Sequence, residues 1–152
     1  MIDLCRFTGD NLLASFYQIL PEHSLIYASY SDTVVTDEYL RVVNGVMDHP
    51  DFRVEFKQLI DLTELKEIRL DYVKVMKAQA RMADLIANAR CDILSVVVAP
   101  TPVALEAAKM VLRSWDGQDT PVVRRIVSDM SKAAILLGFG KNKYRDLIQQ
   151  LT

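Results

Sequence analysis

The chain has 152 residues, of which 51% are hydrophobic and 25% are charged. A chain of this length buries roughly 68–70% of its unfolded surface around one core, so it needs no disulfide or metal to fold. The formal net charge is −2, which argues against a dedicated nucleic-acid partner, because binding to phosphates requires a basic face. We therefore expect a single domain over residues 1–152.

The two cysteines and the apolar runs indicate the cellular compartment in which the protein works. Cys5 and Cys91 form no disulfide framework, which is typical of a protein of the reducing cytoplasm. Cys91 precedes an apolar run and has no neighbouring base, so we expect a small core residue there. The first residues lack the basic start and apolar segment of a signal peptide, and the longest uncharged run, 93–105, contains two prolines. We expect no membrane span and a cytoplasmic protein.

The first third of the chain predicts a hairpin and a helix. "LLASFYQIL" and "SLIYASYSD" are β-compatible runs separated by "PEH", which indicates an antiparallel hairpin over residues 12–20 and 24–30. Thr36, followed by two acids, predicts the capped start of a helix that ends at "HPDF". Gly45 weakens the helical propensity of that segment.

The middle third predicts a strand, a polar loop, a helix and a second strand. Residues 56–62 form the first strand, and a helix runs from 71 to about 89. Apolar residues recur every three or four positions along it, which predicts that they face the core: Val73, Met76, Ala80, Ala83 and Ala87. Three successive valines within residues 94–99 suit a strand that is buried on both faces.

The last third predicts a helix, a strand and two further helices. Thr101 and Pro102 begin a helix with small residues on one face. In "PVVRRIV", Arg124 and Arg125 must point to opposite faces, so one of them either lies at an edge or meets an acidic partner. "SDMSKAAILLGFG" is a capped helix that ends on glycines, and a C-terminal helix covers about 141–151.

This order predicts an α/β fold with one mixed sheet of about five strands. The N-terminal hairpin supplies an antiparallel pair, and each later strand returns through a right-handed helical crossover to a parallel neighbour. The core of the domain covers about residues 12–138.

Four short motifs resemble one family. They are a strand followed by a threonine-acid helix start, the turn "HPDF", a strand ending in "DL", and the strand end "VVAP". Together they resemble the SpoIIAA-like branch of the STAS fold, the fold of anti-sigma-factor antagonists. The resemblance covers about residues 12–138, and implies that the helices lie mainly on one face of the sheet.

The segment after "DL" is the first candidate site. In the antagonists this loop carries a D-S-S-G segment with a phosphorylated serine, whereas "LTELKEIRLDY" has neither serine nor glycine and only Thr63 as a hydroxyl before Tyr72. Asp61 is either a phosphoacceptor or, as we favour, a turn former that bonds a nearby amide. With Asp71, Lys74 and Lys77 these residues form a candidate contact surface, although a lysine run is also typical of a solvated helix face.

Further along the chain, Thr101 is a candidate anion or ligand site at a strand end, or simply the cap of its helix. His23 and His49 are isolated from each other and from cysteines, so we predict no metal site. No nucleophile and base occur at a recognisable spacing, so we predict no enzyme and no cofactor.

Two functions remain. The first is a non-enzymatic regulatory domain that binds another protein, or a second copy of itself as a homodimer, through the helices beside the 61–71 loop. The alternative is binding of a small apolar or amphipathic, lipid-like ligand between the sheet and the helices. The second rests on a set of large apolar residues that either line a cavity or fill the core: Met47, Met76, Met82, Met110, Met130, Phe56, Phe139 and Trp115.

Overall fold

The computed structural model describes residues 7–8, 11–12, 15–115 and 120–151. Its centre is a five-stranded sheet with the order β3-β4-β6-β8-β9, in which β3 runs antiparallel to β4 and the other neighbours are parallel. This confirms the predicted mixed sheet with its N-terminal hairpin. The strands are β3 (Phe16–Leu20), β4 (Leu25–Ser29), β6 (Lys57–Asp61), β8 (Ile93–Val98) and β9 (Val122–Val127).

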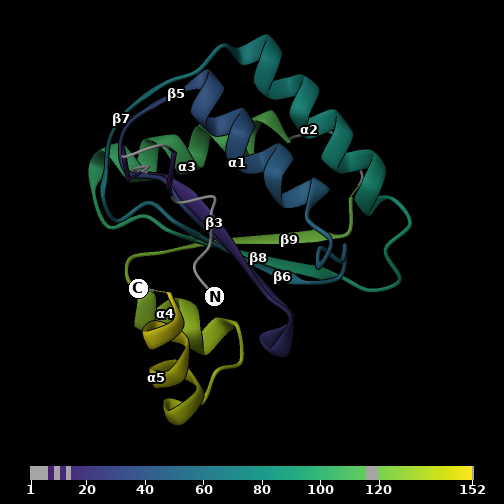
Figure 1. Cartoon of the computed structure of the whole chain (residues 1–152), viewed down its shortest axis with the longest axis vertical. Helices are drawn as coiled ribbons and strands as arrows, with labels where there is room; N and C mark the ends of the chain where they lie inside the picture. Colours follow the sequence, from purple (N-terminus) through teal and green to yellow (C-terminus); the bar gives the residue numbers. More distant parts are fainter. Residues whose placement is uncertain (1–6, 9–10, 13–14, 116–119, 152) are drawn as a thin grey trace.

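Five helices flank this sheet on its two sides (Figure 1). The three longest lie on one side: α1 (Thr36–Asp48), α2 (Tyr72–Ile86) and α3 (Pro102–Ser114). The two shorter ones, α4 (Met130–Leu136) and α5 (Lys141–Gln150), lie on the other. The expectation of helices mainly on one face therefore holds for the long helices, while the C-terminal pair covers the opposite face.

The N-terminal part of the chain that the structure describes also contains three short elements. A 3-10 turn, η2 (Pro21–His23), joins the strands of the hairpin. Near the N-terminus, β1 (Phe7–Thr8) and β2 (Asn11–Leu12) pair with each other in an antiparallel ribbon. Cys5 and residues 116–119 lie outside the described residues.

The predicted polar loop after Leu62 is wrong, because the chain there forms a strand. β7 (Leu65–Arg69) pairs in parallel with β5 (Asp32–Val35), beside the main sheet. Leu65 is buried and Ile68 packs against the core, while Lys66 and Glu67 face solvent. The partner strand lies some thirty residues earlier, so no local sequence pattern indicates the pairing.

The predicted inner face of α2 is also wrong. Its buried residues are Val75, Ala78, Gln79 and Ile86, whereas Val73 and Met76 on the predicted face are 63% and 44% exposed. Both stripes have helical spacing, and the true inner face contains a glutamine, which the pattern counts as polar.

Side chains alternate along the strands between two cores. Leu59 and Val96 point towards α4 and α5, while their neighbours Ile60 and Val97 point towards α1 and α3. Val96 and Val98 are buried, as the valine run predicts. Ile60, within the predicted strand 56–62, is half-buried.

Local contacts correct two further expectations and explain a glycine. Thr36 does not cap α1, because its hydroxyl instead accepts a hydrogen bond from the backbone N–H of Asp71, 2.7 Å away. Cys91 is exposed, not a core residue.

Gly45 lies against the Tyr17 ring, where an added Cβ would stand 2.6 Å from the nearest ring carbon. No helix in the described ranges is long and apolar enough to cross a membrane.

Candidate functional site: a cavity between the sheet and the long helices

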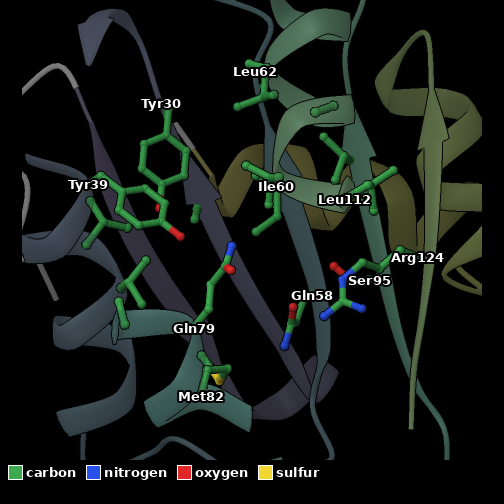
Figure 2. Close-up of a pocket in the computed structure, with 18 of the residues that line it drawn as sticks. Tyr30, Tyr39, Gln58, Ile60, Leu62, Gln79, Met82, Ser95, Leu112 and Arg124 are labelled. Atoms are coloured by element: carbon green, nitrogen blue, oxygen red, sulfur yellow. The ribbon is translucent and has the colours of Figure 1, made fainter. Parts of the chain in front are cut away.

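A cavity of about 170 Å³ lies between the sheet and helices α1, α2 and α3. Its walls are mostly aliphatic and alanine side chains, and the alanines Ala78, Ala107 and Ala108 leave the space that larger residues would fill. Side chains from four strands of the main sheet form its floor (Figure 2). An apolar cavity of about 150 Å³ is large enough to hold a benzene molecule and stays free of water, so this one can accept a small apolar group.

A polar row crosses the floor of the cavity. Gln58 on β6 is paired in register with Ser95 on β8, and Ser95 is paired with Arg124 on β9. All three side chains line the cavity, and paired residues on neighbouring strands lie about 5 Å apart, so the row spans three adjacent strands. Polar groups are therefore confined to one strip of an otherwise apolar floor.

Arg124 supplies the charge of this row. It lies on β9, an edge strand of the main sheet, and the sequence predicts an edge position or an acidic partner for one arginine of the pair. Its guanidinium carbon stands 4.3 Å from the centre of the Trp115 ring. No ion pair joins Arg124 to a carboxylate in residues 15–115 and 120–151. Burial lowers the pKa of the guanidinium, yet an arginine remains protonated at physiological pH.

A buried amide also faces the cavity. Gln79 is 3% exposed, and its Nε2 donates to Ser114 Oγ at 2.6 Å. Ser114 Oγ in turn donates to the Val111 carbonyl at 2.6 Å, so its only proton is used and the Gln79 group that meets it must be the N–H₂. Gln79 Oε1 is then an acceptor without a hydrogen-bond partner in the described structure.

Two stacked tyrosines border the cavity away from the polar row. The rings of Tyr30 and Tyr39 have centres 5.9 Å apart and lie within 26° of parallel. Burial raises the pKa of Tyr39 to about 12, and burial together with neighbouring Tyr39 raises the pKa of Tyr30 well above its usual value. Both phenols are therefore neutral at physiological pH. No aspartate or glutamate is among the described lining residues, so Arg124 carries the charge of this site.

The loop candidates Asp61 and Thr63 form a local turn on the other side of the sheet. Asp61 Oδ1 accepts hydrogen bonds from the Thr63 backbone N–H at 3.0 Å and from the Thr63 hydroxyl at 2.5 Å. Its Oδ2 accepts from the hydroxyl of Tyr27, a residue of the α4–α5 core, at 2.8 Å. This is the turn-forming role that the sequence favours for Asp61.

The remaining predicted site residues lie apart from this turn. Asp71 caps α2, since its carboxylate accepts from the backbone N–H groups of Val73 and Lys74. Lys74 and Lys77 are exposed on the same helix, and within the described ranges no hydrogen bond or ion pair connects them to Asp61 or Thr63. Strand β7 lies between the two groups along the chain.

Thr101 acts as the cap of α3. Its hydroxyl accepts a hydrogen bond from the Ala104 backbone N–H at 3.1 Å, which is the simpler of the two roles considered for it. The described residues contain no group of three or more His, Cys, Asp or Glu side chains that could hold a metal ion.

The cavity residues were partly visible in the sequence. Ser95 is the polar residue within the otherwise apolar strand "ILSVVV", and this interruption is a usable signal, whereas Gln58 lies in the mixed strand "KQLID" and is not distinguished there. Of the large apolar set considered for a cavity, Met82 and Trp115 line it, while Met130 and Phe139 pack on the opposite side of the sheet. The sequence did not identify Gln79, because the pattern assigned a different stripe of α2 to the core.

Comparison of the chain with protein-family models, curated proteins and solved structures found no match. The resemblance to the anti-sigma-factor antagonists therefore stays a prediction.

Proposed function

We propose that the protein binds a small apolar or amphipathic ligand in the cavity between its sheet and helices α1, α2 and α3. The observation that carries the proposal is the cavity itself, because protein interiors are normally packed with few voids larger than a water molecule. A small-molecule site is typically a largely apolar hollow with a few polar groups that fix orientation, and this cavity has that composition.

Binding of naphthalene, followed by saturation-transfer difference NMR, tests this proposal. Ala78→Leu places a larger side chain in the cavity wall on α2, and we expect it to abolish the transfer signal while keeping the protein folded. Ala80→Leu is the matched control, since Ala80 lies on the exposed side of the same helix. Naphthalene binding that survives Ala78→Leu would place the ligand elsewhere. A wild type that binds neither naphthalene nor the aliphatic probes octanoate and octanol would refute the proposal.

A second candidate function is contact with another protein, and it rests on the outer face of α2. Tyr72, Val73 and Met76 are 53%, 63% and 44% exposed and follow the 61–71 segment directly. Adjacent exposed apolar side chains on a helix are typical of an interaction surface. A second copy of the chain is the partner that can be examined with the protein alone.

Sedimentation velocity over a concentration series distinguishes this second candidate. A dimer that dissociates in Val73→Lys, but not in Lys77→Ala on the neighbouring part of the helix, would support self-association through this face. A wild type that remains monomeric at every concentration would exclude the homodimer.

A further inference from the structure

We propose that the ligand is an amphipathic monoanion, a carboxylate with a small apolar body, whose carboxylate binds Arg124 beside Ser95 and Gln58. This inference rests on the proposed function and names the class of ligand. Its first support is the placement of charge: one end of an apolar cavity carries a guanidinium that is not paired with a carboxylate in the described structure.

Arg124 is half-buried, and a cation that is partly removed from water without a partner is unfavourable, so proteins normally pair it. The Trp115 ring beneath Arg124 offsets part of that cost and holds the guanidinium in place. The N–H groups of the guanidinium have no acceptor among the described residues, so they can donate to a ligand or to solvent. A carboxylate fits this fork with two parallel hydrogen bonds.

The neighbours of Arg124 suit the same group. Ser95 has a hydroxyl that can donate and stands in register beside Arg124. Gln58 has an amide N–H₂ that can donate and stands in register on the far side of Ser95. Three donors in a row match the several lone pairs of a carboxylate. No aspartate or glutamate is among the described lining residues.

The single charge selects a monoanion. A phosphate monoester carries close to two negative charges at neutral pH and is usually bound by several cations or a helix N-terminus. Arg124 is the cationic residue among the described lining side chains, and a carboxylate balances it.

The apolar body then extends along the strands. Two residues beyond the polar row, Ile60 and Val97 follow on the same face of β6 and β8, about 7 Å further along. Leu62 and the stacked tyrosines border the space beyond them, as Figure 2 shows. The ligand therefore has one polar end and one apolar end, which lie over different parts of the sheet.

Isothermal titration calorimetry with octanoate and octanol tests the inference. These molecules share the same chain and differ in the charged group, so the wild type should bind octanoate at least tenfold more tightly. Arg124→Met should weaken octanoate about tenfold to a hundredfold, the range expected for lost charge-assisted hydrogen bonds, and leave octanol unchanged. Arg125→Met, on the opposite face of the same strand, is the matched control and should change neither.

The possible failures are distinguishable. If naphthalene binds but octanol binds as tightly as octanoate, or if octanoate does not bind at all, the carboxylate assignment is overturned and the cavity function stands. If octyl phosphate binds more tightly than octanoate, the ligand is not a monoanion. If naphthalene, octanoate and octanol all fail to bind, the proposed function itself fails. The wild-type comparison needs no variant, so a poorly folded Arg124→Met would not leave the inference undecided.

Discussion

The two faces of the sheet are packed differently, although the same strands build both. On the α4–α5 face, Leu59, Val96 and Val98 are at most 1% exposed, and Leu137 and Leu147 from the helices cover them at the same level of burial. On the α1–α3 face, the alternate residues of the same strands are Gln58, Ile60, Ser95 and Val97, which line the cavity.

This difference separates stability from binding. Close packing gains dispersion and hydrophobic energy from every atom, while a cavity forfeits those contacts. A chain of this size has enough core on the α4–α5 side and around α1 to tolerate an unfilled space. The α1–α3 face is therefore where a ligand can contribute the contacts that the protein itself does not make, and ligand binding should raise the stability of the fold.

The largest expected effect comes from truncating neighbouring residues that point to the two faces. Leu59→Ala should lower the free energy of unfolding by about 2–5 kcal/mol, since it opens a cavity in close packing. Ile60→Ala should cost only about 1–2 kcal/mol, because Ile60 is half-buried and already borders a space. Urea denaturation of both variants measures the difference, and equal losses would show that the two faces are packed alike.

Gly45→Ala should have the next largest effect on the free energy of unfolding. It tests a place on the α1–α3 face where the packing is tight. Its new Cβ would stand 2.6 Å from Tyr17, and such overpacking costs about 1–3 kcal/mol, against the roughly 1 kcal/mol that alanine gains in a helix. We expect a net loss of up to about 2 kcal/mol in chemical denaturation. In a Tyr17→Leu background the same change should become neutral or stabilising, and a loss that persists there would exclude the ring contact as its cause.

A smaller effect is expected from the unpaired amide in the cavity wall. Gln79→Met keeps the volume and removes an acceptor whose burial costs about 1–3 kcal/mol, while also removing one hydrogen bond worth about 0.5–1.5 kcal/mol. The ligand-free protein should therefore gain up to about 1 kcal/mol of stability, as measured by thermal and urea unfolding. A loss of more than that would show that Gln79 Oε1 has a hydrogen-bond partner, such as a bound water.

Most of the fold could be predicted because its signals are local. Hairpin spacing, helix caps such as Asp71 and Asp129, and the valine run of β8 each depend on residues within one element. The pairing of β5 with β7 could not, because it joins segments distant in sequence.

The candidate site was predictable only in part, for a similar reason. Ser95 interrupts an apolar strand and can be recognised by itself, whereas a cavity depends on the summed volume of side chains from several helices. The buried Gln79 was hidden because a polar residue on the inner face makes the exposed stripe of α2 look more apolar than the buried one.

The smallest expected effect is a pH dependence at the start of α4, on the closely packed face. Hydrogen bonds from the backbone N–H of Lys132 and then from the Ser131 hydroxyl hold the pKa of Asp129 below its usual value. A carboxyl whose pKa is lower in the folded state stabilises the protein above its unfolded pKa, and this contribution is lost as the pH falls through the folded pKa. Asp129→Asn keeps a good cap but cannot titrate, so the stability difference between wild type and variant should shrink from neutral to acidic pH. Urea midpoints across that range measure it. A difference that stays constant would mean that the Asp129 charge adds nothing to the cap.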